Sequence, residues 1–278
     1  MNARTPLVDL VPRSARCYAG LFAGGVAVVG LLELGHALMP LVAGQTTDGR
    51  VAALDLDGEG SLAVWFSSYT LLAASAVSLL IYALSAPLAT AAAKPSATRR
   101  GIWLWAACCW TAMSIDECSS LHEAFMHLMT RLTGERLSHD GSLWWVLAYG
   151  LVLSTTGLLL LRAMRRAPAA CLAFCSVAVF YGIAVLAELG WLTAKDTFGV
   201  MLEEGCEMLG NLSLLTALAL FARHTADEHR RSEPLVRAVR FPSPQGEPRL
   251  LPSPLAEKVP AGRMRGRGEQ PDVVKHSR

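Results

Sequence analysis

The sequence has few charged residues and no stretch typical of a soluble catalytic domain. Asp, Glu, Lys and Arg make up 17% of its 278 residues, whereas a soluble domain usually contains about 25%. The deficit lies between residues 17 and 221, where long apolar runs follow one another. Runs of about 20 apolar residues can cross the hydrocarbon core of a bilayer as helices. The composition therefore excludes an ordinary soluble protein and predicts an all-α, polytopic membrane helix bundle.

Lysine and arginine are absent from these apolar runs except at their ends. The runs that are long enough to be transmembrane helices number six, at approximately 17–41, 62–90, 101–130, 143–162, 169–193 and 198–222. Basic residues lie instead in the N-terminal stretch, the second and fourth loops and the C-terminal segment. Because positively charged loops stay on the cytoplasmic side, we expect both termini inside (N-in, C-in). The expected location is the cell inner (plasma) membrane.

The spans divide the chain into three parts. Residues 1–16 are expected to form a cytoplasmic N-terminal segment, 17–224 a six-helix transmembrane domain, and 225–278 a disordered, basic cytoplasmic tail. The tail is rich in Pro, Arg, Glu and Ser, so it cannot bury enough apolar surface to fold alone. The expected partner is the lipid bilayer, with a hydrophobic small molecule as substrate and no nucleic acid.

Paired cysteine motifs are also lacking. The chain has seven cysteines, all within or at the edges of the spans, and none forms a C-x-x-C pair. A disulfide framework and a zinc ribbon are therefore both excluded. Cysteines buried in helices are expected to act as small apolar side chains.

The spans contain an excess of acid instead. Carboxylates and imidazoles occur within them at Glu33, Asp116, Glu117, Glu123, Glu188, Glu203, Glu204 and Glu207, and at His36, His122 and His127. Each ionisable group at membrane depth costs about 2.5–3.5 kcal/mol on insertion scales. Protons or bound metal cations can offset this cost, and the two alternatives define different functions.

The expected topology brings these groups to one layer, the outer half of the membrane. Asp116, Glu123 and His127 fall in a stripe about 40° wide on the third span at 3.6 residues per turn. Glu117 and His122 point away from this stripe and are expected to flank the site. Four helices that carry acids to the same depth predict a shared acidic site.

Three local spacings within these spans are typical of metal ligands on helices. Residues 33–36 form an E-x-x-H unit, which carboxylate-bridged sites in helix bundles use. Residues 123–127 and 203–207 each place two donors one turn apart. Mixed carboxylate and imidazole ligands suit Fe or Mn best, with Zn as an alternative.

These spacings predict a site for a divalent metal, mononuclear or dinuclear. The predicted metal ligands are Glu33, His36, Glu123, His127, Glu203, Glu204 and Glu207. The predicted catalytic residues are Asp116 and Glu188, each as a further ligand or as a general base beside the metal.

Two short segments resemble those of a known group. Residues 114–123 read SIDECSSLHE and residues 202–210 read LEEGCEMLG. They are similar to signatures of uncharacterised prokaryotic multi-pass membrane proteins, which carry a D-E…H-E element on one span and E-E-x-x-E-M-x-G on the last. The resemblance implies a shared acidic site and nothing about the substrate. The H-x-x-H-H boxes of membrane di-iron desaturases and hydroxylases are absent, and the seven-span arrangement of ceramidase-like zinc hydrolases matches poorly.

The pattern as a whole favours an integral membrane metalloprotein. The excess of carboxylate over imidazole favours a membrane oxidoreductase acting on a lipid-like or quinone-like substrate, and metal-dependent hydrolysis fits the same residues. A proton- or metal-cation-coupled transporter is the alternative from another class, because rows of acids mark ion pathways. The inner halves of the spans are apolar apart from Ser, Thr and Cys, which disfavours a through-path. A structural subunit of a membrane complex is a third interpretation.

Overall fold

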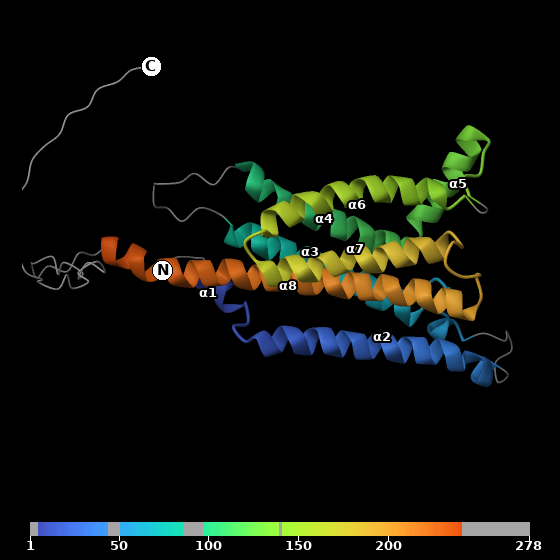
Figure 1. Ribbon diagram of the computed structural model, residues 1–278, viewed down its shortest axis with the longest axis horizontal. Coiled ribbons are helices and arrows are strands. Elements are labelled where there is room, and N and C mark those ends of the chain that lie inside the picture. Colours follow the sequence, from blue (N-terminus) through green and yellow to red (C-terminus); the bar gives the residue numbers. More distant parts are fainter. Residues whose placement is uncertain (1–4, 44–50, 86–96, 139–140, 241–278) are drawn as a thin grey trace, which may run out of the picture. The chain divides into compact units, whose positions relative to one another are not determined.

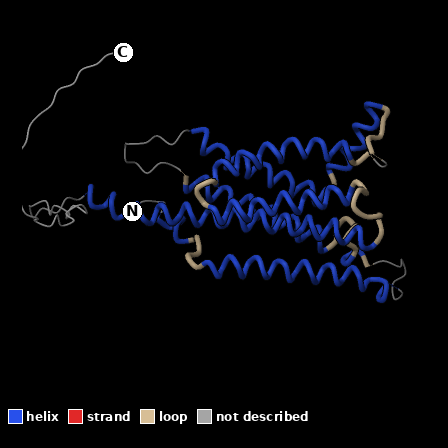
Figure 2. Tube along the Cα trace, in the orientation of Figure 1, coloured by secondary structure: helices blue, strands red, loops and turns tan. Residues whose placement is uncertain are grey.

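The computed structural model describes residues 5–43, 51–85, 97–138 and 141–240, and every regular element in these ranges is a helix (Figures 1 and 2). The prediction of an all-α fold is therefore confirmed. The elements are α1 (Thr5–Asp9), α2 (Ala15–Ala43), the short 3-10 helix η1 (Ala52–Leu54), α3 (Leu62–Leu84), α4 (Ala97–Ser119), α5 (Leu121–Thr133), α6 (Leu143–Met164), α7 (Pro168–Glu188) and α8 (Thr197–Arg240). The chain divides into two compact units, Met1–Arg237 and Ala238–Arg278.

Five helices are long and apolar enough to cross a membrane, by their length and composition. They are Ala15–Leu41 in α2, Leu62–Leu84 in α3, Leu143–Met164 in α6, Pro168–Glu188 in α7 and Thr197–Ser232 in α8. α4 runs beside them (Figure 1) but is not one of the five. Its hydropathy is lowered by three tryptophans and by the acidic pair Asp116 and Glu117 near its end.

The expected third span, 101–130, is not a single helix. α4 ends at Ser119, and Ser120 adopts a left-handed conformation with φ 50° and ψ 41°. This conformation is uncommon for a residue other than glycine, and it sends α5 across the end of the bundle (Figure 1). Asp116 supports the break, because its Oδ1 accepts a hydrogen bond from the backbone N–H of His122 at 2.7 Å. That N–H is one of the donors that a new helix start leaves unpaired.

α8 continues beyond residue 222, the expected end of the last span, to Arg240. Residues 225–240, expected in the disordered tail, are therefore helical, and the rest of the expected tail lies outside the described residues. Ion pairs one turn apart join Arg223 to Asp227 at 3.7 Å and Asp227 to Arg230 at 2.8 Å. Such pairs stabilise a helix by about 0.2–0.5 kcal/mol each, a local contribution that hydropathy does not register.

The hydrophobic core lies between α3, α4, α6, α7 and α8. Trp103 of α4 stacks on Phe221 of α8 with ring centroids 4.8 Å apart. Leu160 and Met164 of α6 and Leu218 of α8 are fully buried in the same cluster. The main core thus joins α4 to the helices that are apolar enough to cross a membrane.

A seam of hydroxyl groups joins α3 to α4. Ser68 and Ser114 each donate to the other's backbone carbonyl, at 2.8 and 2.9 Å. Further along, Ser75 donates to the carbonyl of Ala107 at 2.9 Å and its hydroxyl lies 2.8 Å from that of Thr111. Small hydroxyl residues allow close helix approach and supply bonds between helices in an apolar medium. Ser68 and Ser75 of α3 therefore act as packing groups between the two helices.

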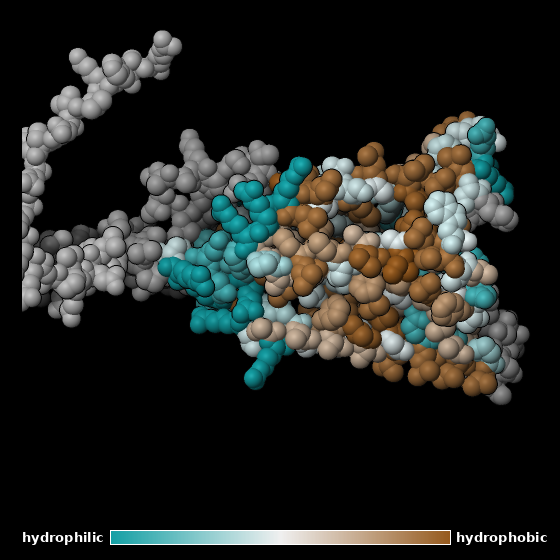
Figure 3. All heavy atoms as spheres, viewed as in Figure 1, coloured by the Kyte–Doolittle hydropathy of each residue, from teal (hydrophilic) through white to brown (hydrophobic). Residues whose placement is uncertain are grey.

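Charges separate between the two ends of the Met1–Arg237 unit. The ends of α2, α4 and α7 lie together with α5 and the starts of α3, α6 and α8 (Figure 1). This is called the acid end, because it carries Glu33, Asp116, Glu117, Glu188, Glu203, Glu204 and Glu207. The opposite, basic end carries Arg100, Arg162, Arg165, Arg166, Arg223 and Arg230, and Figure 3 shows hydrophilic side chains gathered there beside a largely apolar midsection.

Candidate functional site

The acid end centres on Asp116, which is 7% exposed. Its Oδ2 accepts a hydrogen bond from the Tyr149 hydroxyl at 2.5 Å and lies 3.1 Å from Nδ1 of His122. An ionised carboxylate only accepts hydrogen bonds, so the His122 ring presents its Nδ1–H to it. In the neutral ring Nε2 then carries a lone pair, free for a proton or a metal. Carboxylate–histidine pairs of this kind orient metal-binding imidazoles.

Three glutamates lie around this pair. Glu117 of α4 is within electrostatic range of Glu207 and His122, and it shares a hydrogen bond with Ser67 of α3. Glu204 of α8 is within range of both Glu207 and Glu117. Each of the three keeps part of its surface accessible. Neighbouring negative charges repel strongly where water is scarce. The three glutamates therefore require protons or a cation.

We call Asp116, Glu117, His122, Glu204 and Glu207 the acid cluster. Tyr181 of α7 borders it, within electrostatic range of Glu207 and Glu117. The Tyr181 hydroxyl donates to Oδ1 of Asn211 at 2.5 Å, and Asn211 itself is buried. α4, α5, α7 and α8 therefore all contribute polar groups to one region.

Two glycines of the segment 202–210 let neighbouring side chains lie against the backbone of α8. A Cβ atom on Gly210 would stand 3.0 Å from ring carbons of Tyr181, closer than a real Cβ tolerates without movement. A Cβ on Gly205 would collide with Oε1 of Glu33. The lack of a side chain at these two glycines thus allows Tyr181 of α7 and Glu33 of α2 to lie close to α8.

The predicted ligands of α2 have partners of their own. His36 is buried, with 6% of its surface exposed, and its Nδ1 accepts a hydrogen bond from the N–H of Leu56 at 3.1 Å. Asp55 lies 3.9 Å from the same nitrogen. Glu33 faces Gly205, and its Oε1 is buried without a hydrogen bond to any described residue. In this arrangement His36 anchors the loop before α3, and Glu33 retains an unused acceptor.

Glu188 and Glu203 share a lysine. Lys195, in the loop between α7 and α8, forms an ion pair with Glu203 at 3.0 Å and a shorter one with Glu188. Burial opposes the charge of Lys195, but its hydrogen bonds to Glu188 and Glu203 raise its pKa above the ordinary value. These two acids are therefore compensated by a cation on the protein itself.

Glu123 and His127 lie on α5 and are exposed. The turn at Ser120 removes them from the stripe that a continuous helix would have shared with Asp116. His122, expected to flank the site, instead contacts Asp116 directly. Tyr149 was not among the predicted residues, since it comes from another helix and no local spacing connects it to Asp116.

The predicted site is therefore only partly assembled. Asp116, Glu204 and Glu207 come together, joined by Glu117 and His122. Glu33, His36, Glu188 and Glu203 have other contacts, and Glu123 and His127 face outward. Among the described residues, no three His, Cys, Asp or Glu side chains are spaced so that they could hold a metal ion as they stand.

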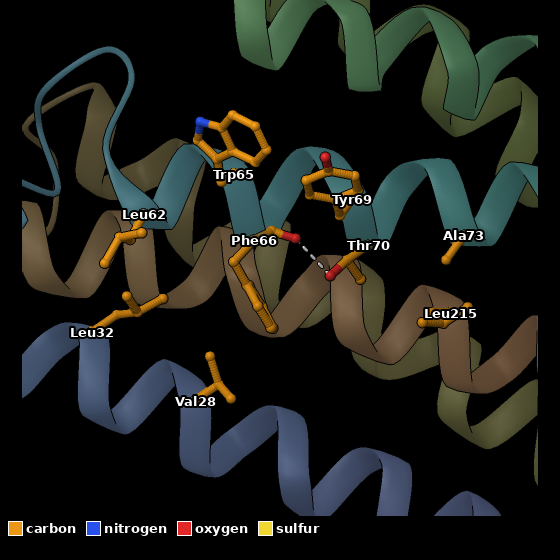
Figure 4. A pocket seen from close by; sticks show the side chains of 9 residues that line it. All are labelled: Val28, Leu32, Leu62, Trp65, Phe66, Tyr69, Thr70, Ala73 and Leu215. Carbon is orange, nitrogen blue, oxygen red and sulfur yellow. Dashed lines mark hydrogen bonds between the residues drawn. The ribbon is translucent and has the colours of Figure 1, made fainter. Parts of the chain in front are cut away.

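An apolar groove lies between α2, α3 and α8 (Figure 4). Its volume is about 480 Å3, and it is lined by Val28, Leu32, Leu62, Trp65, Phe66, Tyr69, Thr70, Ala73 and Leu215. The Thr70 hydroxyl donates to the carbonyl of Phe66 at 2.7 Å, so this donor is not available to a ligand. The groove is suited to a hydrocarbon chain, and Glu33 follows its lining residue Leu32 in sequence.

The fold and the cluster together define the class: an all-helical protein with the helix lengths of a multi-pass membrane protein and a polar site at one end. Residues 20–222 match the family described as Domain of unknown function (DUF8692), and the chain belongs to that family. The matched residues include every member of the acid cluster. No curated protein and no solved structure matches the chain.

Proposed function

We propose that this protein is an integral membrane metalloprotein that binds a divalent cation in the acid cluster and acts on a lipid-like or quinone-like substrate. The observation that carries the proposal is the bond between Asp116 and Nδ1 of His122. It leaves Nε2 available on an imidazole that lies within electrostatic range of Glu117 and Glu207. A histidine held in this way is prepared to bind a metal.

The donor types fit a hard or borderline cation. One imidazole and three carboxylates suit Fe or Mn, with Zn as an alternative. As the side chains stand, the donors are too widely spaced, so binding requires the glutamate side chains to rotate toward His122. Glu117, Glu204 and Glu207 are partly exposed as residues. A cation would remove the repulsion between these three acids.

A bound metal would supply Lewis acidity or redox chemistry. The protein residues would do the rest: Asp116 holds the imidazole, Tyr149 donates to Asp116, and Glu33 keeps a buried acceptor that no described residue uses. The groove supports a hydrophobic substrate, since its volume of about 480 Å3 falls within the usual range of about 300–1,000 Å3 for small-molecule sites. Oxidation is favoured by the excess of carboxylate, and hydrolysis is the alternative reaction.

The proposal includes the topology. α4 serves as a sixth span, because the core packs it among the helices that can cross a membrane. The Arg-rich basic end lies in the cytoplasm under the positive-inside rule, so both termini are inside and the acid cluster opens outward in the inner (plasma) membrane.

Elemental mass spectrometry of the purified, detergent-solubilised protein tests the proposal. We expect stoichiometric Fe, Mn or Zn in the wild type and its loss in Glu207→Gln and Glu117→Gln. Glu123→Gln is the matched control, since Glu123 is an acid of a neighbouring helix that is exposed. Retention of metal in Glu207→Gln would contradict the proposal. An equal loss of metal in Glu123→Gln would instead favour the ligand set predicted from sequence spacing, which includes Glu123.

A second candidate is a proton-coupled transporter. The wide spacing of the donors favours it, because separate carboxylates bind protons without having to converge. Its test is proton uptake by liposomes containing the protein, with Glu207→Gln as the inactive variant. Metal-free protein that moves protons would favour the transporter over the metalloprotein.

A further inference from the structure

α5 exposes an apolar stripe that no helix of the described residues covers. Leu121, Phe125, Leu128 and Leu132 are 36% to 71% exposed. At 3.6 residues per turn they fall within an arc of about 60°. Four exposed large side chains on one narrow arc are unusual for a surface that faces water.

The remainder of α5 separates into two other faces. Met126 and Met129 are partly buried on the side where α5 packs against α6, and a Cβ on Gly141 would lie 3.1 Å from Met126. Glu123, His127 and Arg131 are exposed on the remaining side of the helix, centred about 130° from both the methionines and the apolar stripe. α5 is therefore amphipathic even though one face already packs against protein.

The direction of α5 differs from that of the other long helices. α2, α3, α4, α6, α7 and α8 run along one axis, whereas α5 runs across that axis at the acid end (Figure 1). Figure 3 shows apolar side chains on the side of α5 that faces along the bundle and hydrophilic ones on the outer side. If the five apolar helices cross a bilayer, α5 lies parallel to its surface with its apolar side toward the hydrocarbon.

We propose that α5 is an interfacial helix that docks on the lipids of the leaflet at the acid end. Its stripe of Leu121, Phe125, Leu128 and Leu132 enters the boundary between headgroups and acyl chains, while Glu123, His127 and Arg131 face water. Amphipathic helices in the membrane plane have this distribution of side chains. Lipid is the fitting partner because the helices beside α5 already require a bilayer at that place.

This docking has a consequence for the acid cluster. His122 lies in the first turn of α5, and both its backbone N–H and its ring bind Asp116. The depth of α5 in the lipid therefore sets the position of the imidazole. The inference goes beyond metal binding, and it holds whether the cluster takes a metal or protons.

Cysteine accessibility in lipid nanodiscs tests the proposal. Single substitutions Leu128→Cys, Leu132→Cys, His127→Cys and Arg131→Cys are reacted with a charged, membrane-impermeant maleimide. Fragment masses assign the reaction to each cysteine, so the native ones remain in place. We expect residues 128 and 132 to react at least about tenfold more slowly than 127 and 131, because a charged reagent does not enter the apolar boundary.

The pattern along the helix separates the alternatives. Reactivity that follows the helix face supports interfacial docking. Reactivity that changes steadily from residue 127 to 132 would overturn it in favour of a membrane-spanning continuation of α4. Equally fast reaction at all four positions would overturn it in favour of a helix projecting into water. Retained helicity by circular dichroism confirms that each variant is folded, and metal content is not part of the readout.

Discussion

The two ends of the bundle use their charged residues differently. At the basic end, side-chain nitrogens bind fixed backbone acceptors: His229 Nε2 lies 2.6 Å from the carbonyl of Leu84, and Arg230 donates to the carbonyls of Val8 and Val11 at 2.7 and 3.0 Å. Arg100 donates to the carbonyl of Tyr82 at 3.1 Å. These contacts hold helix ends in place.

At the acid end, charges of one sign face one another. Glu207 lies within electrostatic range of both Glu117 and Glu204, while His122 acts on Glu117 and Glu207, and Lys195 acts on Glu207. Carbonyls and Asp227 give the basic groups acceptors and a countercharge, whereas a carboxylate beside a carboxylate needs a proton or a cation. The basic end thus fixes helix ends in place, whereas the acid end concentrates carboxylates, which supports the binding role proposed above.

Removing Asp116 should have the largest effect. Asp116→Ala loses the acceptor for Tyr149 and for two groups of His122, and we expect a destabilisation of about 3–5 kcal/mol, as for other broken buried pairs. Asp227→Ala is the basic-end control, with an expected cost of at most about 1 kcal/mol because its side chain is 39% exposed. Thermal unfolding in detergent measures both. Equal decreases in unfolding temperature for Asp116→Ala and Asp227→Ala would contradict the difference between the two ends.

Arg230→Ala should come next. It removes the donor to the carbonyls of Val8 and Val11, and hydrogen bonds from charged groups contribute about 1.5–3 kcal/mol each. We expect faster amide exchange across residues 7–12, with the acid end unchanged. Arg231→Ala replaces the exposed neighbour and should leave exchange as it is. Faster exchange around Asp116 in Arg230→Ala would show that the ends are coupled.

Gly210→Ala should have a moderate effect. The added methyl group meets the Tyr181 ring at 3.0 Å, and overpacking of this kind costs about 1–3 kcal/mol. In Gly157→Ala the nearest atom, on Phe174, is 3.7 Å away. That control should be neutral, or up to about 1 kcal/mol more stable from helix propensity. Comparable unfolding temperatures for the two variants would contradict the close approach of Tyr181 to α8.

Lys195→Gln should have the smallest effect. Its ion pairs with Glu188 and Glu203 are partly exposed, so we expect a cost of at most about 1 kcal/mol. Because the pKa of Lys195 is raised in the fold, its contribution is fully present below the unfolded value of about 10.4 and is lost only as the pH rises through the folded value. The difference in unfolding temperature between variant and wild type should therefore be constant from pH 6 to about pH 9. A difference that already shrinks between these limits would argue against the ion pairs.

Much of the fold could be predicted from local patterns. Apolar runs located the helices, and the acids of α2, α4, α7 and α8 were expected at one end, where they lie. The break at Ser120 could not be predicted in this way, since residues 101–130 contain no proline and Ser120 reads as an ordinary helix residue. The break is supported by the Asp116 side chain, four positions before Ser120. Asp116 belongs to α4 but caps the start of α5.

The sequence predicted that the candidate site would consist of carboxylates and histidines. It did not predict which of these residues come together. Glu123 and His127 do lie one turn apart on α5, but both side chains face away from the acid cluster. Lys195 could not be matched to Glu188 and Glu203 from the sequence, because the pairing depends on how the α7–α8 loop folds back.

By itself the sequence determined that this protein is helical, that its helices are apolar enough for a membrane, and that acids and bases separate to opposite ends. These properties follow from residue type and helical period, which act within one segment. Tertiary structure alone decided that His122 and Tyr149 both contact Asp116 while His127 does not. That choice depends on where α4 ends and how α6 packs beside it, and such contacts between distant segments leave no periodic trace in the chain.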